Sequence, residues 1–231
     1  MTEMTTPVLL QRSLAAVYRF HDVFFEPADG RTPLIERPLN VTIPALRWSA
    51  FRSPTDLTYR FSWLTLTQPI PSNRPSPPQP ASFAVEVTDP SGDYVNFEDP
   101  ANMALSLPLP VSAPPRASDF LITKPLWPTA AFRPPSGETA VRGSLSSPTA
   151  QSVADLKVEI WLGAAPAPPA GTPFTRTNAN GDFLYRLPLL KGSPGNTLMA
   201  NIRLNGGAVA VTPASLPILI GHTRNILFLR T

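Results

Sequence analysis

The sequence predicts an all-β protein built as two tandem antiparallel β-sandwiches joined by a proline-rich arm. The 31 prolines among 231 residues oppose long helices, because a proline inside a helix removes a hydrogen bond and clashes with the preceding turn. Segments in which apolar and polar residues alternate recur along the chain, and this is the pattern of half-buried strands. The two halves also repeat the same order of such segments, which predicts two copies of one β module.

The repeat consists of three segments in each half of the chain. They are residues 38–43, 50–61 and 83–92 in the first half, and 155–160, 174–187 and 199–207 in the second. At 231 residues the chain suits two domains of about 100 residues each. The repeat therefore predicts the architecture, but it gives no information about a reaction or a partner.

The first module is expected at residues 16–110, after an N-terminal arm at residues 1–15. Its clearest strand is 57–63, in which Leu57, Tyr59, Phe61 and Trp63 alternate with polar residues and are expected to face the core. The other strands of this module are expected at 16–25, 38–43, 83–87 and 104–109. Between Gln68 and Pro80 nearly every second residue is proline, which predicts an extended loop.

Residues 111–136 are expected to form an ordered arm rather than a plain linker. This segment is rich in proline but also carries the large apolar residues Phe120, Leu121, Ile122, Leu126, Trp127 and Phe132. The second module is expected at 137–231, with strands at 141–145, 156–162, 183–187, 198–204, 207–211 and 226–229. Asn205-Gly206 predicts a tight hairpin turn, because both residues tolerate a positive φ.

Three short segments of the second module carry a family likeness: Val141-Arg142-Gly143, Ala154–Val158 and Thr177–Phe183. A strand ending in Arg-Gly, a strand of alternating apolar residues and Thr-x-x-x-Gly-x-Phe together resemble the carboxypeptidase-regulatory-like family of transthyretin-like (prealbumin-like) β-sandwiches. Thr149–Ser152 replaces the glycine-x-proline that is usual before the second strand. The resemblance implies Ig/prealbumin-like sandwiches and a non-catalytic role as a spacer, stalk or accessory domain.

A second likeness covers Pro128–Gly143. Its pattern of proline, phenylalanine and Arg-Gly is similar to segments of accessory proteins in contractile injection systems and phage tails. This resemblance implies a subunit of a larger assembly.

Charge and composition narrow the range of partners. The net charge is +3, but lysines and arginines are scattered singly, whereas neutralising several phosphates needs clustered cations. Nucleic acid is therefore not an expected partner. No apolar stretch approaches the ~20 residues that a bilayer span requires, so membrane insertion is not expected either.

The start of the chain, Met1–Pro7, does not read as a signal peptide, so the protein is expected to be made in the cytoplasm and to leave the cell only as part of a particle.

The sequence contains no convincing catalytic or metal-binding constellation. It has no cysteine, no Gly-x-Ser-x-Gly motif and two histidines, His21 and His222, that lie far apart in sequence. Five acids gather near one turn (Glu86, Asp89, Asp93, Glu98 and Asp99), and a solvated loop explains them better than glycosidase or calcium chemistry. We therefore expect no enzyme activity, no cofactor and no metal.

The large aromatic residues are the candidate partner contacts: Trp48, Trp127, Phe132 and Trp161. Trp161 lies on the strand face opposite Val158 and Ile160, so it is expected to be exposed or to be covered by the arm around Trp127. Exposed tryptophans are common in protein interfaces and in sugar-binding platforms.

The leading functional hypothesis is a non-enzymatic structural or interaction protein, an accessory or scaffold subunit of an assembly such as a phage-tail-like contractile injection system. Its partners would be other protein subunits, including further copies of this chain. The alternative is a carbohydrate- or cell-surface-binding adhesin module that uses Trp48, Trp161 or Tyr94 to stack on a glycan.

Overall fold

The computed structural model describes residues 9–25, 34–67, 81–98, 103, 105–107, 121–187 and 195–231, with side chains except at 9–15, 62–67, 81 and 105–107. Regular structure in these ranges consists of strands and short 3-10 turns, which confirms the all-β prediction. The predicted loop Gln68–Pro80 and the first part of the predicted arm, 111–120, lie outside the described residues.

The chain divides into two compact units. Unit 1 comprises Met1–His21, Leu34–Pro90 and Phe97–Lys124, and unit 2 comprises Asp22–Pro33, Ser91–Asn96 and Pro125–Thr231. Unit 2 therefore includes two short segments from the first half of the sequence.

Unit 1 contains several small sheets of different sizes. The largest sheet has the order β4 (Phe51–Ser53), β5 (Thr58–Thr67), β1 (Leu9–Asp22) and β10 (Leu121–Pro128). The last residues of β10 belong to unit 2, where they pair with β8 (Tyr94–Val95). A second sheet has the order β3 (Trp48–Ser49), β2 (Asn40–Ile43) and β7 (Glu86–Thr88), and a third pairs β6 (Ala81–Phe83) with β9 (Leu105–Leu107). Part of the predicted arm is thus a strand, β10.

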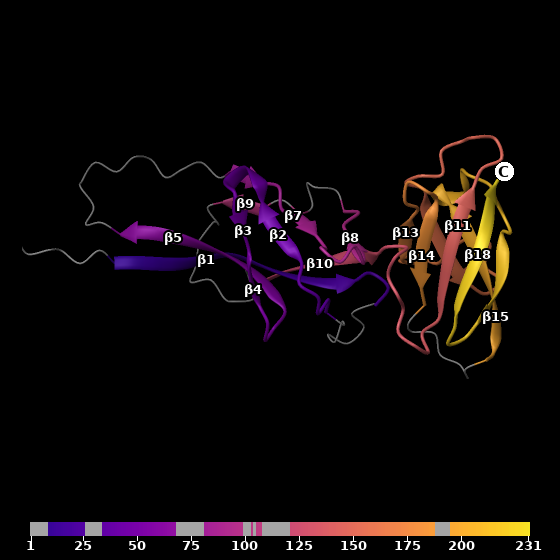
Figure 1. Ribbon diagram of the computed structural model, residues 1–231, viewed down its shortest axis with the longest axis horizontal. Helices are drawn as coiled ribbons and strands as arrows, with labels where there is room; N and C mark the ends of the chain where they lie inside the picture. The colour runs from indigo at the N-terminus through magenta and orange to yellow at the C-terminus, as the bar shows by residue number, and fades with distance from the viewer. Residues whose placement is uncertain are drawn as a thin grey trace, which may run out of the picture. The chain divides into compact units, whose positions relative to one another are not determined.

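Strands β1 and β5 form a long antiparallel pair, here called the ribbon, within the sheet that also contains β4 and β10. They pair antiparallel from Leu9 opposite Thr67 to Arg19 opposite Thr58, with a bulge between Leu14 and Ala16. Strand β1 has 14 residues and extends over about 45 Å, more than twice the usual strand length. In Figure 1 the two strands run on side by side past the other labelled strands of their unit.

Aromatic residues fill the core of unit 1 where β1 and β5 are adjacent. The rings of Tyr18 and Phe61 meet edge to face at 6.1 Å, and those of Phe20 and Tyr59 at 5.5 Å, and all four side chains are buried. The predicted inward positions Tyr59 and Phe61 are thereby confirmed. Leu57 was expected in the same strand but lies in the preceding turn with a φ of 53°.

Unit 2 is a sandwich of two four-stranded sheets. One has the order β14 (Asp182–Arg186), β11 (Ala140–Ser146), β18 (Thr223–Arg230) and β16 (Val211–Thr212); the other has the order β13 (Phe174–Arg176), β12 (Lys157–Leu162), β15 (Thr197–Leu204) and β17 (Ser215–Leu219). All these pairs are antiparallel except β11 with β18, which is parallel. Apolar side chains from both sheets form one core.

Steric needs explain the glycines of the motif that resembles the carboxypeptidase-regulatory-like family. Gly143 lies opposite Phe183 in the β11–β14 pair, and a Cβ on Gly143 would overlap the Phe183 ring. Gly181 has a φ of 85°, and a Cβ there would overlap the carbonyl oxygen of Leu145. The aromatic ring therefore takes the space that a side chain at position 143 would occupy.

The predicted turn at Asn205-Gly206 is confirmed, with φ values of 43° and 68°, but the predicted hairpin is reduced to a single bridge. A 3-10 turn does form at Asn205–Gly207, but β15 before it pairs with β12 and β17, and β16 after it pairs with β18 in the other sheet. Only one bridge, between Leu204 and Val209, joins the two arms of the turn in the described part of the chain. The turn thus carries the chain from one sheet to the other, a choice that the local residue types do not reveal.

Candidate functional site

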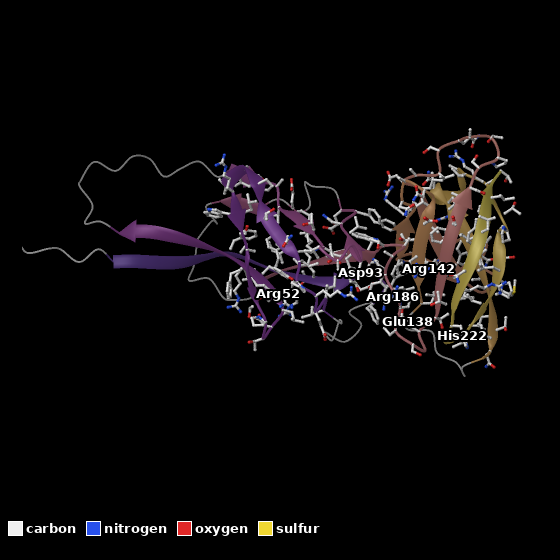
Figure 2. All side chains as sticks on the ribbon, viewed as in Figure 1. Arg52, Asp93, Glu138, Arg142, Arg186 and His222 are labelled. Carbon is white, nitrogen blue, oxygen red and sulfur yellow. The ribbon has the colours of Figure 1, made fainter. Side chains whose placement is uncertain are left out.

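The most unusual chemistry among the described residues is a buried charged cluster in unit 2. The guanidinium of Arg186, on β14, forms an ion pair with the carboxylate of Asp22, and both side chains are 4% exposed. The same guanidinium donates to both carboxylate oxygens of Glu138, from Nε at 2.5 Å and from Nη2 at 2.6 Å. Figure 2 shows Arg186 and Glu138 close together.

Two aromatic rings and two further donors complete this cluster. The Arg186 guanidinium carbon lies 4.7 Å from the centre of the Phe132 ring and 4.9 Å from that of Phe25. Asp22 also accepts hydrogen bonds from the Tyr94 hydroxyl at 3.2 Å and from the Phe24 amide at 3.0 Å. A planar guanidinium suits such a site, because it can stack on rings while its fork binds carboxylates.

The electrostatics of the cluster indicate a structural role. Burial raises the pKa of Asp22, and the opposing effects of Arg186, the Phe24 amide and Tyr94 offset this only in part. Burial also acts to lower the pKa of Arg186, but Glu138 and Asp22 outweigh it and raise that pKa. A guanidinium held charged between two carboxylates cannot exchange protons near neutral pH. Instead, the cluster ties together segments around residues 22–25, 94, 132–138 and 186.

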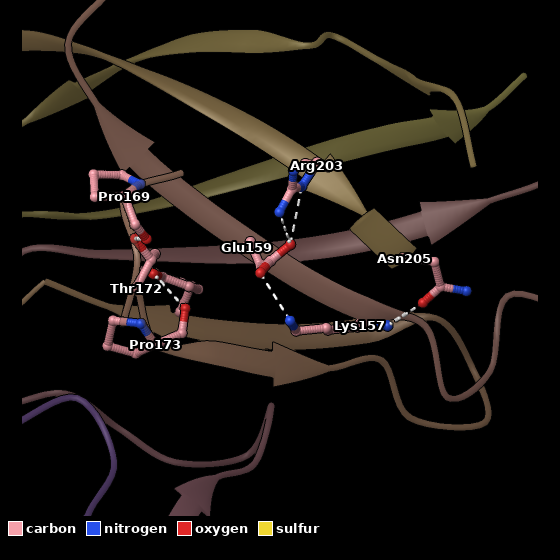
Figure 3. Close-up of polar contacts among 8 residues, drawn as sticks. Lys157, Glu159, Pro169, Thr172, Pro173, Arg203 and Asn205 are labelled. Carbon is pink, nitrogen blue, oxygen red and sulfur yellow. Dashed lines mark hydrogen bonds and ion pairs between the residues drawn. The ribbon is translucent and has the colours of Figure 1, made fainter. Parts of the chain in front are cut away.

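A second set of ion pairs lies on the sheet that contains β12 and β15. Glu159 accepts hydrogen bonds from Lys157 at 2.8 Å and from Arg203 at 2.8 and 3.0 Å (Figure 3). Burial acts to raise the pKa of Glu159, but the hydrogen bonds from Lys157 and Arg203 more than offset it, so the pKa lies below its usual value. Asn205 accepts a hydrogen bond from the Lys157 amide and so ties the turn between the sheets to β12.

The structure does not bring the four candidate partner contacts together. Trp127, Phe132 and Trp161 are buried in unit 2, and Trp48 is half-buried in β3 of unit 1. Trp127 packs on Phe174 at 5.4 Å between ring centres, whereas Phe132 packs on Arg186. Contact of these residues with a partner stays a prediction.

Trp161 is covered by the loop that follows its own strand. Its indole nitrogen donates to the carbonyl of Ala165 at 2.8 Å, and only 7% of the residue is exposed. An indole buried to this extent offers no face on which a sugar ring can stack. Of the three predicted sugar platforms, Trp48 and Tyr94 are half-buried.

The histidines and the acidic turn residues hold no cation site in the described ranges. His21 is half-buried, and burial lowers its pKa, whereas His222 is exposed in the turn before β18. Glu98 pairs with Lys124 at 3.1 Å, and Asp99 lies outside the described residues. Over the described part of the chain, no three His, Asp or Glu side chains are placed to bind a metal together. Within the same part, no helix has the length and apolarity of a membrane span.

Sequence reasoning did not find the open edge of strand β18. One edge of β18 pairs with β11 from Thr223 to Leu229, but the other edge meets β16 only at Leu229 and Arg230. From Thr223 to Phe228 this outer edge has no neighbouring strand among the described residues. On the same strand Leu227 is 63% exposed and Leu229 is 42% exposed. Proteins usually block such edges, because unpaired N–H and C=O groups bind other strands.

A hollow lies beside Leu227 on the same sheet. It has a volume of about 470 Å³ and is lined by Ala130, Arg142, Ser144, Asp182, Asn225 and Leu227, among others. The guanidinium of Arg142, which Figure 2 labels, already donates to the carbonyl oxygens of Ala130 and Phe132. The hollow therefore lies next to the exposed Leu227 and is lined by both polar and apolar groups.

Fold and sites together define an all-β protein with two sheet units, a buried charge cluster and an open strand edge. No family model matches the chain, and no curated protein matches it. Among solved structures it is similar to the minor pilin GBS52 of Streptococcus agalactiae, at 10% identity, covering 94% of this chain and 96% of the pilin, with a TM-score of 0.27.

Two other solved structures show likeness at the same level. The shaft pilin SpaA of Lactobacillus rhamnosus GG is 10% identical over 96% of this chain and 98% of the pilin, with a TM-score of 0.28. The Bacillus anthracis TIE protein is 6% identical over 95% of this chain, with a TM-score of 0.27, and this chain spans 34% of it. TM-scores this low carry no argument about function.

Proposed function

We propose that this chain is a non-enzymatic structural protein that assembles with other protein subunits by adding β-strands. The observation that carries the proposal is the ribbon of β1 and β5. Beyond the Thr58–Arg60 segment that pairs with β4, the outer edge of β5 has no neighbouring strand among the described residues, and such an edge gains stability when a further strand pairs with it. A ribbon of this length is therefore suited to contact another subunit.

The residues along the ribbon support this role. Its register pairs Leu10 with Leu66, Arg12 with Leu64 and Leu14 with Ser62. Leu10, Leu64 and Leu66 therefore occupy adjoining register positions of the ribbon, together with Arg12. Leucines at adjoining register positions of an open ribbon favour burial against a partner.

We propose that the assembly is a particle such as a phage-tail-like contractile injection system. The similarity of Pro128–Gly143 to accessory proteins of contractile injection systems and phage tails supports a particle of that kind, although none of the three solved structures named above is such a protein. The adhesin alternative retains Trp48 and Tyr94 as its candidate stacking residues. A glycan array probed with the wild type and with Trp48→Ala separates this alternative from the assembly role.

The assembly role is tested by the mass of the full-length protein in solution across a range of concentrations. We expect particles heavier than the 25.0 kDa chain, and we expect the double variant Leu64→Lys/Leu66→Lys to be monomeric, since two buried charges would prevent the contact. Thr65→Lys/Thr67→Lys is the matched control, because it adds the same two charges at the alternate positions of β5. A wild-type protein that stays monomeric at every concentration, with a protease-resistant ribbon, contradicts the proposal.

A further inference from the structure

We propose that the open edge of β18 is the acceptor site for β5 of a second copy of this chain. This inference rests on the proposed assembly role and names both of its contact surfaces. The edge from Thr223 to Phe228 offers unpaired backbone N–H and C=O groups, and only an extended strand can pair with such a row. The occupant is therefore a strand and not a helix or a small molecule.

The edge of β18 lacks the features that normally protect an edge strand. Lysine and proline, which keep other strands away, are absent from Thr223 to Arg230. The edge strand β17 of the other sheet, by contrast, has Pro217 at its centre. The two arginines of β18 are held by hydrogen bonds to other segments. Arg224 donates to the carbonyl of Pro217, and Arg230 donates to the carbonyl of Ser152.

The side chains of β18 specify what an added strand should carry. Leu227 and Leu229 are two residues apart, so they lie on the same face, and both are exposed. A strand added along the open edge would place an apolar residue opposite Leu227, and this residue would reach Leu229 diagonally, because Leu229 itself is already opposite Thr212 of β16. The Leu64-Thr65-Leu66 segment of β5 offers two leucines for this position.

Strand β5 also has a free edge of suitable length. It pairs with β4 only from Thr58 to Arg60, so its outer edge from Phe61 to Thr67 has no partner strand among the described residues. Residues 61–67 contain no charged side chain, and an added strand would thus bring no positive charge toward Arg224 and Arg230. The two free edges are similar in length, both strands carry leucines, and residues 61–67 add no charge beside the arginines of β18.

The proposed contact joins different surfaces of the two copies. Each copy offers one β5 edge and one β18 edge, so the contact is heterologous, and repeating it joins copies head to tail. Assembly of this kind continues until a ring closes or a different subunit caps the end.

The natural absence of cysteine allows a direct test in the full-length protein. We would prepare Leu64→Cys and Leu66→Cys as donor variants and Leu227→Cys as the acceptor variant, mix donor with acceptor, and oxidise. A disulfide requires the two Cα atoms to lie within about 7 Å. We expect a cross-linked dimer in the mixture. Thr197→Cys, at an exposed position on the other sheet, is the control acceptor and should give no such dimer.

Each outcome decides one of the two proposals. Donor–acceptor cross-links that exceed the Thr197→Cys control, together with loss of the heavy species in Leu227→Lys/Leu229→Lys, support the inference. Acceptor–acceptor cross-links through Leu227→Cys alone would overturn the choice of β5. If Leu64→Lys/Leu66→Lys abolishes assembly but the β18 variants leave it intact, the inference fails and the proposed function stands. A wild-type monomer overturns both.

Discussion

Arg186 and Asp22 are 164 residues apart in sequence, yet they form an ion pair in which both side chains are 4% exposed. Glu138 binds the remaining fork of the same guanidinium, and Phe25 and Phe132 lie within 5 Å of its centre. The pair makes unit 2 depend on a segment that lies between two parts of unit 1 in sequence. Removal of this ion pair should therefore destabilise unit 2 as a whole.

Replacing Arg186 with methionine should destabilise the protein by about 3–5 kcal/mol, because two buried carboxylates lose their counter-charge. The measurement is the free energy of unfolding in urea. Arg176→Met is the matched control: its ion pair with Asp155 is 31% and 78% exposed, so its loss should cost about 0–1 kcal/mol. Equal costs for the two variants would show that the cluster contributes nothing special.

The contribution of Asp22 to the free energy of unfolding should increase as the pH falls. Because its pKa is raised in the folded state, the folded protein takes up a proton at a pH where the unfolded chain does not. The stability from this group is full below the unfolded pKa and is lost as the pH rises through the folded pKa. Unfolding free energies of wild type and Asp22→Asn, compared from pH 7 to pH 4, should shift in favour of the wild type on acidification. A difference that is independent of pH contradicts this assignment.

Glu159 should have the opposite dependence. Its folded pKa lies below the usual value of 4.5, because hydrogen bonds from Lys157 and Arg203 outweigh the effect of burial. Its contribution is present above the unfolded pKa and is lost as the pH falls through the folded pKa. The advantage of wild type over Glu159→Gln should therefore shrink below about pH 4.5. An advantage that persists in acid would mean that packing, rather than charge, stabilises this position.

Gly143→Ala should destabilise unit 2 by about 1–3 kcal/mol, because the new methyl group overlaps the Phe183 ring. The double-mutant cycle with Phe183→Leu isolates the cause. In the Phe183→Leu background the smaller side chain leaves room, so the alanine should cost less than in the wild type. Additive costs would indicate that the backbone, and not the ring, requires glycine.

Phe24→Ala should lower stability by about 3–5 kcal/mol through a cavity in the core of unit 2. The ring is 4% exposed and lies 4.7 Å from the ring of Tyr185. Thermal unfolding followed by near-ultraviolet circular dichroism is a suitable measurement. Phe51→Ala, which removes a ring that is 68% exposed, is the control and should leave the midpoint nearly unchanged.

Much of the strand layout could be predicted from alternation alone, but the pairing of strands could not. The strands at 141–145, 156–162, 183–187 and 198–204 are confirmed as β11, β12, β14 and β15. Strands β13 and β17 were not predicted, because each is short and contains or adjoins proline. The sheet change at Asn205–Gly207 was also missed, since a turn sequence specifies a local bend and not the sheet that the next strand joins.

The sites were less predictable than the strands. Arg186 gave one signal, a charged residue within the otherwise apolar segment Phe183–Leu187, but its partners Asp22 and Glu138 are too distant in sequence for any local pattern to connect them. The open edge of β18 had no signal at all, because whether an edge is free depends on which strands come to lie beside it.

The sequence alone determined the all-β class, through its prolines and its alternating apolar residues, and it determined the glycine–phenylalanine motif of the second sandwich. The all-β class follows from preferences of residues close in the chain, and the motif is recognisable as a short pattern, although the contact that requires Gly143 joins it to the distant Phe183. Only the tertiary structure decided which strands pair, which tryptophans are buried, and how residues 22–25 come to belong to unit 2. Such outcomes depend on the total burial and charge pairing of distant segments, and no short stretch of sequence contains them.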